Sequence, residues 1–232
     1  MRMSVRSLWI LAVLLAALPW AGAAPAPTTQ WVEGRNYSLI QPAQPTSVGP
    51  GKIEVTEIFS YACPACNAFH PFMDRLQESL PANVVVNYVP ASFNPTEDWP
   101  MFQRAYYTAL VLNLINKSTH DAMYDAVWKT GELAVMVPGT NQLRRPPPSI
   151  EDAARFYAQQ SGVNPQTFIS TANSFGVDSR IRQADQYVRD CLVEETPTII
   201  VNGTYRISGR AAGSYQQMVE LTKYLVAKLS HG

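Results

Sequence analysis

Two cysteines three positions apart are the residues of this chain best suited to chemistry. They lie in the stretch Cys63-Pro64-Ala65-Cys66, directly after an apolar run at 53–61. A disulfide across so short a loop constrains the unfolded chain little, because loop-closure stabilisation grows with loop length. We therefore predict that the pair is reactive and exchanges between a dithiol and a disulfide.

The apolar spacing after Cys66 predicts that the pair opens a helix. A helix that begins at Pro64 makes Cys63 its N-cap, beside backbone N–H groups that have no partner inside the helix. These donors and the helix dipole stabilise a thiolate, so we expect the pKa of Cys63 to lie below its reference value of about 8.5. Cys63 is expected to be the exposed nucleophile and Cys66 the less accessible resolving thiol. The helical spacing is given by Phe69, Phe72, Met73, Leu76 and Leu80, and Pro81 ends it.

A zinc site is the alternative use of the cysteine pair. Zinc takes four ligands, and the other soft donors are Cys191, His70, His120 and His231, with no second paired motif. We therefore expect no metal. Cys191 has no partner nearby in the sequence, and we expect a buried, inert thiol. A bridge to another molecule and a regulatory thiol stay open for Cys191, and His70 is expected on a helix surface.

The strand before the cysteines carries a carboxylate. Glu57 shares a strand face with Ile53, Val55 and Phe59, because alternate residues point to the same side. A carboxylate among apolar side chains is unfavourable unless it is hydrated, paired or protonated. The residues alone leave open whether Glu57 lies buried near the cysteines or at a solvated sheet edge.

The first 23 residues are typical of a secretory signal peptide. Arg2 and Arg6 give a positive start, residues 8–18 are almost entirely apolar, and small residues follow at 21–23. We expect cleavage near Ala24 and export to an oxidising compartment, with an uncleaved anchor as the alternative. No later stretch approaches the roughly 18 apolar residues of a transmembrane helix, so a soluble mature protein is expected.

Composition argues against two classes of partner. The 232 residues include 18 Lys and Arg and 18 Asp and Glu. Loss of the signal segment would leave a slight acidic excess, because that segment carries two arginines and no acidic residue. Neither a nucleic acid nor a lipid surface is indicated as a partner. The length suits one large domain or a domain with an insertion.

The elements around the cysteines form a predicted βαβ unit. Residues 24–51 are rich in Pro, Thr, Gln and Gly and are expected to form an arm, with at most one short edge strand near 37–41. Strands are expected at 53–59 and 84–89, with the cysteine-bearing helix between them. One helix between two strands favours a right-handed crossover and parallel pairing.

A helical block follows, and then a strand pair and a last helix. Expected helices run from about 97 to 115, capped by Asn94 or Thr96, and from 120 to 130. A loop at 137–148 precedes three further helices, which begin at a capping box of Ser149 with Asp152, at Asn164-Pro165 and at Asp178. The end of the chain reads as a strand at 198–201, a hairpin turn at Asn202-Gly203, a strand at 205–207 and an amphipathic helix after Gly209.

Three features in this order resemble the DsbA family of thiol-disulfide oxidoreductases. They are the run Glu57-Ile58-Phe59-Ser60-Tyr61-Ala62-Cys63-Pro64-Ala65-Cys66, the helical block, and Thr196-Pro197 followed by 198–203. The resemblance covers nearly all of the chain after the signal segment. It implies an α/β, thioredoxin-like fold with a helical insertion domain. The implied division is a signal peptide at 1–23, an N-terminal arm at 24–51, a βαβ part at 52–92, the insertion at 93–190 and a ββα part at 191–232.

The resemblance implies that substrate binds beside a cis proline. The Thr196-Pro197 bond is expected to be cis, which would place the backbone of Thr196 next to Cys63, where an extended substrate peptide can pair with it. The residues alone favour a trans bond, because only about 5–6% of X-Pro bonds in folded proteins are cis. The resemblance also implies that Glu57 lies beneath the dithiol and helps to move its protons.

Three other positions bear on the strength of the oxidant. Pro64 and Ala65 are the dipeptide that tunes redox poise in the family, and Ala65 stands where members often carry His. Asn87 is expected to replace a lysine that often accompanies the acid. We therefore expect an oxidant weaker than a relative with His at the position of Ala65. Because Asn87 lacks the amine of a lysine, a pairing of Glu57 with a basic side chain is in doubt.

The implied function is that of a periplasmic protein dithiol oxidase. A thiolate of an unfolded or reduced exported polypeptide attacks Cys63, a second substrate thiol resolves the mixed disulfide, and the enzyme leaves reduced. The resemblance implies reoxidation by a DsbB-type, quinone-linked membrane partner, a monomeric state and no bound cofactor. A disulfide isomerase or reductase and a peptide-binding chaperone module without redox turnover are the alternatives.

Overall fold

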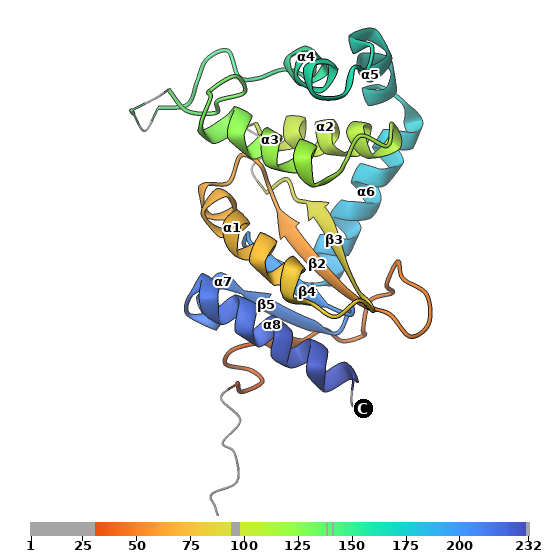
Figure 1. Cartoon of the computed structure of the whole chain (residues 1–232), viewed down its shortest axis with the longest axis vertical. Helices are drawn as coiled ribbons and strands as arrows, with labels where there is room; N and C mark the ends of the chain where they lie inside the picture. Colours follow the sequence, from red (N-terminus) through yellow and green to blue (C-terminus); the bar gives the residue numbers. More distant parts are fainter. Residues whose placement is uncertain (1–30, 94–97, 138, 141, 231–232) are drawn as a thin grey trace, which may run out of the picture. The chain divides into compact units, whose positions relative to one another are not determined.

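A five-stranded mixed sheet organises the residues that the computed structural model describes, which are 31–93, 98–137, 139–140 and 142–230. The strand order is β1-β5-β4-β2-β3, and β2 pairs in parallel with β3 and antiparallel with β4 (Figure 1). The predicted strands and the hairpin are confirmed. Their bounds are β1 Ser38–Leu39, β2 Ile53–Phe59, β3 Val84–Pro90, β4 Thr198–Val201 and β5 Tyr205–Ser208.

Two helices cover the sheet face that bears Glu57. They are α1 (Pro64–Ser79) and α8 (Tyr215–Ser230), which also pack against each other (Figure 1). Every residue of β2 is buried, as a central strand between two layers requires. The apolar contacts of this face join Val55, Phe69, Met73, Ile199, Leu221 and Leu225.

The helical insertion contributes five helices to the described chain. They are α2 (Trp99–Val111), α3 (Lys117–Trp128), α4 (Ile150–Ser161), α5 (Pro165–Ala172) and α6 (Phe175–Asp190). The predicted capping box of Ser149 and Asp152 is confirmed, because each side chain accepts the backbone N–H of the other residue. Asn164 caps α5 with its side-chain oxygen, which accepts the N–H groups of Gln166 and Thr167.

The first insertion helix is shorter than the predicted 97–115. Its N-cap position is Asp98, and Asn94 and Thr96 lie outside the described residues. It ends at Val111 because the chain turns at Asn113, whose φ of 57° is left-handed and ends the helical repeat. Apolar periodicity continues past this turn, and the sequence pattern could not reveal the break.

Two other helices begin before the predicted positions. α3 begins at Lys117 instead of His120, because Asn116 and Thr119 form a capping box that the apolar pattern does not reveal. α6 begins at Phe175 instead of Asp178, because Ser174 accepts the N–H of Val177. The prediction also omitted a short helix, α7 (Gly209–Ala212), between β5 and α8.

The arm before β2 is fixed to the sheet by a buried carboxylate. Glu54, which is 2% exposed, accepts hydrogen bonds from the backbone N–H of Ser47 at 2.9 Å and from the hydroxyls of Ser47 and Thr56. The N–H of Gln44 donates to the carbonyl of Gly203 at 2.9 Å. The arm therefore packs on the β4–β5 turn.

The described chain from Trp31 onward forms one compact unit. The predicted signal segment, 1–23, lies outside the described residues. Within the described part, no helix combines the length and the hydrophobicity needed to cross a bilayer.

Replacing Gly203 by alanine should destabilise the fold through the contact with the arm. Gly203 has a φ of +62°, and an added Cβ would lie 2.0 Å from the backbone oxygen of Gln44. We expect Gly203→Ala to lower the free energy of unfolding by about 2–5 kcal/mol, since left-handed strain and a clash with backbone act together. Equilibrium denaturant unfolding measures this loss.

Gly162→Ala is the matched control. Gly162 has a φ of +75° with no atom within 4 Å of an added Cβ, so only the strain of about 1–2 kcal/mol is expected there. Equal losses in the two variants would contradict the proposed clash with the arm.

Candidate active site

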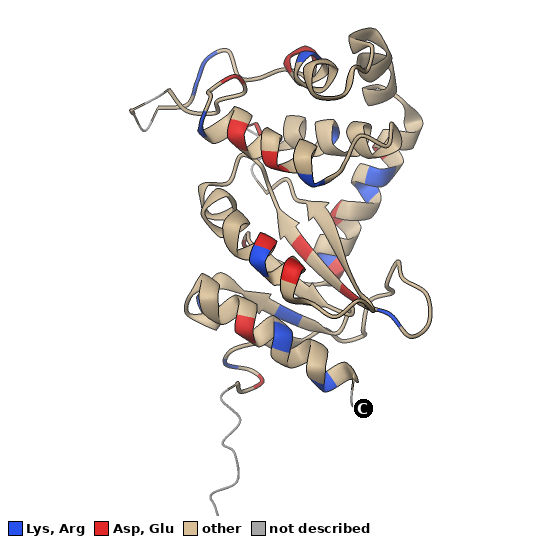
Figure 2. Ribbon diagram, viewed as in Figure 1, with Lys and Arg blue, Asp and Glu red and all other residues tan. Residues whose placement is uncertain are grey.

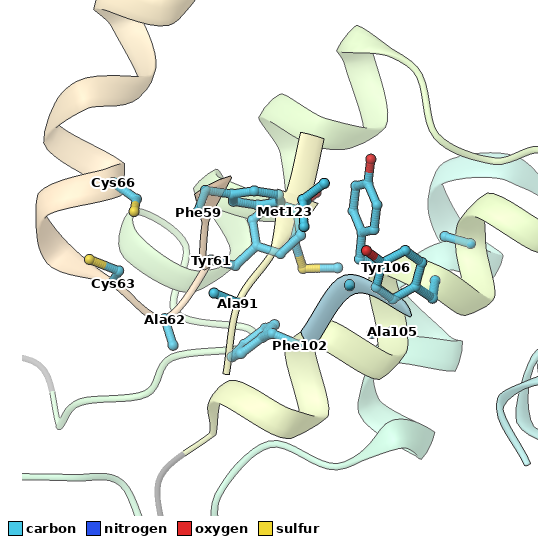
Figure 3. Close-up of a cluster of buried hydrophobic side chains, with 14 of the residues drawn as sticks. Phe59, Tyr61, Ala62, Cys63, Cys66, Ala91, Phe102, Ala105, Tyr106 and Met123 are labelled. Carbon is cyan, nitrogen blue, oxygen red and sulfur yellow. The ribbon is translucent and has the colours of Figure 1, made fainter. Parts of the chain in front are cut away.

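The first turn of α1 brings the two cysteines together at the end of β2. Cys63 occupies the N-cap position in an extended conformation, and Pro64 is the first helical residue. Cys66 lies one turn further on, and Figure 3 shows the two sulfur atoms close together at this turn. Both cysteines are free thiols. The predicted helix start is confirmed.

Hydrogen bonding lowers the pKa of Cys63 from its ordinary value of 9.0 to about 6. The Cys66 thiol contributes most, and Thr196 and the N–H groups of Cys66 and Ala65 add to it, whereas burial opposes the shift. The N–H groups of a first helical turn have no partner within the helix and are available to a thiolate. At pH 7 roughly nine in ten Cys63 side chains are therefore ionised.

Cys63 is far less exposed than predicted. Its exposed fraction is 6%, against 0% for Cys66. The prediction of an exposed nucleophile was wrong in degree, and Thr196, which is distant in sequence, contacts the Cys63 sulfur. The predicted order of accessibility is confirmed. Burial raises the pKa of Cys66 well above its ordinary value, so Cys66 keeps its proton while Cys63 is ionised.

The loop before β4 supplies the backbone next to Cys63. The Thr196-Pro197 bond is cis, as the resemblance implied. The thiol of Cys63 donates to the carbonyl of Thr196 at a sulfur–oxygen distance of 3.7 Å. The hydroxyl of Thr196 has no hydrogen-bond partner among the described residues, so it can donate to the sulfur once Cys63 is ionised.

Glu57 is the buried carboxyl of this site. It is 1% exposed, and neither of its oxygens has a hydrogen-bond partner within the described chain. Burial, followed by the charges of Asp74 and Cys63, raises its pKa from 4.5 to about 8. A solvated position at the sheet edge is therefore excluded, and Glu57 carries a proton at neutral pH.

The strand register corrects the prediction for Asn87. Asn87 lies opposite Thr56, and Tyr88 lies opposite Glu57. Paired residues of neighbouring strands point to the same face, so Asn87 points away from Glu57 and does not occupy the position of a partner for that acid. We did not identify Tyr88 from the sequence as a neighbour of Glu57. Alternation along β3 separates Tyr88 from Asn87 and could have indicated it.

Aromatic side chains of the insertion enclose the end of β2. Tyr61 and His120 share a hydrogen bond of 2.7 Å, and the indole N–H of Trp128 donates to the backbone oxygen of Tyr61 at 2.8 Å. Phe59 packs edge-on against Tyr61 and His120 at ring distances of 5.0 and 5.3 Å. Figure 3 shows Phe59 and Tyr61 of this cluster near the cysteines. No local sequence signal marks His120 as a neighbour of the site.

His70 is not the surface residue that was predicted. Its imidazole donates to Asp121 of α3 at 3.0 Å and stacks on Tyr124 at 4.4 Å, with 13% of the side chain exposed. The contact with the insertion covers it, and helix periodicity within α1 could not indicate that contact.

Cys191 lies apart from the cysteine pair. It is 0% exposed at the end of α6, and burial raises its pKa to about 11. The expected buried thiol is confirmed, and a protonated, covered thiol is a poor nucleophile.

A groove of about 500 Å³ runs beside the cysteine pair. Thr196, whose carbonyl contacts Cys63, lines this groove. The hydroxyl of Tyr215 donates to the carbonyl of Ala65 at 3.1 Å and fixes the dipeptide between the cysteines. The lining includes Ala65, Thr196, Pro197, Arg210 and Tyr215. An ionised thiol, a protonated neighbouring thiol and a buried acid beside an open groove together can carry out thiol–disulfide exchange.

Comparison with known proteins agrees with this chemistry. No family model matches the chain. The chain is 32% identical over 219 residues to the thiol:disulfide interchange protein DsbA of Pseudomonas aeruginosa, covering 94% of this chain and 95% of that protein. It is 32% identical over 225 residues to the protein of that name from Pseudomonas syringae pv. tomato, covering 97% and 96%.

Solved structures show the same likeness. The crystal structure of the oxidoreductase DsbA from Xylella fastidiosa matches with a TM-score of 0.74 and 33% identity, covering 87% of this chain and 98% of that one. The crystal structure of Pseudomonas aeruginosa DsbA matches with a TM-score of 0.69 and 30% identity, covering 85% and 94%. The thioredoxin-like fold with a helical insertion is thereby confirmed. The chain belongs to the DsbA family of thiol:disulfide oxidoreductases.

Proposed function

We propose that this oxidoreductase works as a disulfide donor, with Cys63 as the residue that substrates attack. The stabilised Cys63 thiolate is the observation that carries this direction. A pKa of about 6 stabilises the reduced pair, and a stabilised reduced form makes the disulfide a stronger oxidant. At pH 7 the shift is worth about 1.4 kcal/mol, or about 30 mV, because only the interval from pH 6 to 7 contributes.

The proposed exchange proceeds in two steps. A substrate thiolate attacks Cys63 of the oxidised pair, the Cys63–Cys66 bond breaks, and Cys66 leaves as a thiolate. Cys66 then takes a proton from Glu57, which we assign as the donor because this buried acid is protonated at neutral pH, and the Glu57 carboxylate regains a proton from solvent before Cys63 is released. A second substrate thiolate attacks the substrate sulfur, which releases Cys63 as a thiolate and leaves the substrate with a disulfide.

The groove beside Cys63 and the membership of the DsbA family also support a proposal for substrates and partners. The groove beside Cys63 suits an extended, unfolded or reduced exported polypeptide, with Thr196 and Pro197 at the contact. We propose that residues 1–23 are a cleaved signal peptide and that the mature protein works in the periplasm as a monomer. A DsbB-type, quinone-linked membrane oxidase would return the pair to the disulfide.

An isomerase or reductase would need the opposite resting state. Such an enzyme must keep its cysteine pair reduced. The stabilised Cys63 thiolate favours the reduced pair at equilibrium, unless an oxidant converts the pair back to the disulfide. The resting state in the periplasm therefore separates the two directions.

Alkylation of Cys63 should report a thiolate at low pH. We expect the rate with iodoacetamide to rise through a midpoint near pH 6, since the thiolate is the reacting form. Cys66→Ala should move the midpoint to higher pH, because it removes the largest source of thiolate stabilisation. Cys191→Ala is the control and should leave the midpoint in place. An unchanged midpoint in Cys66→Ala would contradict the assignment.

Glu57→Gln should stabilise the reduced protein at neutral pH. Because the pKa of Glu57 rises from 4.5 to about 8 on folding, the folded chain holds a proton that the unfolded chain releases, and stability falls as pH rises across this window. Glutamine cannot ionise, so we expect a gain on the order of 3 kcal/mol at pH 7 and no gain near pH 4.5. Denaturant unfolding at the two pH values measures the difference.

Glu54→Gln is the matched control on the same strand. Glu54 accepts hydrogen bonds from Ser47 and Thr56, and glutamine would place an amide where Ser47 donates. We expect a loss of about 1–3 kcal/mol for Glu54→Gln. A loss in both variants would remove the basis for a protonated Glu57. Stopped-flow mixing with a reduced peptide should also show slower exchange for Glu57→Gln alone.

The direction of electron flow has its own test. We expect Cys63 and Cys66 to be mostly oxidised in the periplasm and the pair to be more oxidising than thioredoxin, whose potential is about −270 mV. Equilibration with glutathione gives the potential, and alkylation of acid-quenched cells gives the resting state. A mostly reduced pair with a potential as low as that of thioredoxin would overturn the donor assignment.

Cysteine variants distinguish the oxidase from a peptide-binding module. Cys63→Ser should abolish substrate oxidation, whereas a module without redox turnover would keep its activity. Cys66→Ala should accumulate mixed disulfides between Cys63 and substrates, because the resolving thiol is absent. Mass spectrometry of the trapped complexes identifies the substrate cysteines.

A further inference from the structure

A polar cluster outside the cysteine pair joins α1 to α3. His70 and Asp74 lie one turn apart on α1, and Lys117 and Asp121 lie one turn apart on α3. His70 donates to Asp121 at 3.0 Å, and the ammonium of Lys117 contacts Asp74 at 2.7 Å and Asp121 at 3.0 Å. Acidic and basic residues occur on both helices (Figure 2). None of these four residues exchanges a proton or a sulfur bond in the proposed steps, although the charge of Asp74 contributes to the raised pKa of Glu57.

The donor atoms are arranged as a chelating set. His70, Asp74 and Asp121 each offer one ligand atom, and these atoms lie within 4.8 Å of one another. Ligands of a tetrahedral zinc ion with bonds of about 2.1 Å lie roughly 3.4 Å apart, so small side-chain rotations would close the set. Residues four apart on one helix face, as His70 and Asp74 are, commonly bind one metal ion together.

The ammonium of Lys117 shows that a positive charge can be bound at the centre of the cluster. Its ammonium lies between two carboxylates, and the cluster keeps a net charge of about −1 when His70 is neutral. The Lys117 side chain is 55% exposed, so it can swing into solvent at little cost, since exposed ion pairs contribute only about 0–1 kcal/mol. A metal ion could replace the ammonium and meet both carboxylates.

A buried histidine nitrogen points independently to a ligand. His120 is 4% exposed and lines a cavity of about 260 Å³ together with Asp74, Lys117 and Asp121. The hydroxyl of Tyr61 is hydrogen-bonded to Nδ1 of His120 on the side of the core. Nε2, on the other side of the imidazole ring, therefore faces the cavity. Nε2 has no hydrogen-bond partner among the described residues. A buried nitrogen without a partner is unfavourable, and metal-bound water in the cavity would provide one.

We propose that this cluster binds a divalent transition metal ion, with His70 Nε2 and the carboxylates of Asp74 and Asp121 as ligands in place of the Lys117 ammonium. Water completes the coordination and reaches His120. The site is open enough for entry, because Asp121 is 38% exposed and Asp74 28%.

The ligand types indicate the class of metal. One imidazole nitrogen with two carboxylates suits Zn²⁺, whereas Ca²⁺ prefers six to eight oxygen ligands. Metal binding requires Nε2 of His70 to be free of the proton that it donates to Asp121. The expectation of no metal considered zinc only as a partner of the cysteines, and no sequence pattern brings Asp74 close to Asp121.

Titration of the oxidised protein with Zn²⁺ tests the site. Protein without a histidine tag, with Cys63 and Cys66 joined as a disulfide, leaves no accessible thiol to compete. Calorimetry should find one Zn²⁺ per chain, and Zn²⁺ should raise the unfolding temperature because it binds the folded state. Asp121→Asn and His70→Gln should each weaken binding by at least about tenfold. Ca²⁺ should not bind at matched concentration.

Lys117→Met gives the most discriminating result. Removal of the competing ammonium should tighten Zn²⁺ binding by about tenfold, an effect that a purely structural ion-pair cluster would not produce. Asp125→Asn and Lys129→Met are the matched controls, because they remove a similar pair, joined at 2.6 Å, about two turns further along the chain. These two variants and His231→Gln should bind as the unmodified protein does.

Two outcomes would overturn the proposal. One is undiminished Zn²⁺ binding by Asp121→Asn, which would place the ion elsewhere. The other is Zn²⁺ binding by Lys117→Met that is no tighter than that of the unmodified protein. Unfolding temperatures recorded without metal establish that each variant is folded, and neither outcome bears on thiol–disulfide exchange.

Discussion

The distribution of protons beneath the cysteine pair is the constraint on which the rest of the structure depends. Cys63 is ionised, while Cys66 and Glu57 hold their protons, and all three groups are removed from water. A second negative charge here would lack solvation and would face the first across a medium of low dielectric constant. The site can therefore accept a new thiolate only if a proton moves to it.

The fold places each of these groups through a different element. β2 carries Glu57 two residues before its end at Phe59, α1 begins with the N–H groups that face Cys63, and the loop before β4 brings Thr196 to the sulfur. The insertion adds no ionised group to this set, because burial lowers the pKa of His120 to about 3 and leaves that histidine neutral. The insertion excludes water from the end of β2 and so maintains the raised pKa of Glu57.

Local patterns in the sequence predicted the elements well and the contacts between them less well. Apolar spacing and Pro64 gave the start of α1, and the alternation of β2 placed Glu57 on the right face. The exposure of Cys63 depends on Thr196, which lies more than a hundred residues further along the chain. No local sequence pattern predicts that these two residues are in contact. The prediction that His70 lies on a helix surface was wrong for the same reason, since its partner Asp121 belongs to another helix.

Asn87 shows a different kind of error. The family resemblance implied that it replaces a lysine that often accompanies the acid, whereas the register of β3 against β2 decides which side chain faces Glu57. A shift of one residue moves a side chain to the other face of a sheet. The residue that faces the acid is Tyr88, whose own pKa is raised by burial and by Glu57, so it stays neutral and cannot take the role of a lysine.

Ala65 bears on the ionised fraction of Cys63 at neutral pH less than its missing imidazole suggests. The groups that lower the pKa of Cys63 are the Cys66 thiol, Thr196 and two backbone N–H groups, and none of them depends on the side chain at position 65. Tyr215 holds the Ala65 carbonyl from the far side, which leaves the Ala65 N–H directed to the sulfur. A histidine at this position would add a charge to a set that already ionises Cys63 at neutral pH. Since ionisation at pH 7 is already nearly complete, further stabilisation would act mainly on the potential and little on the fraction of reactive thiolate.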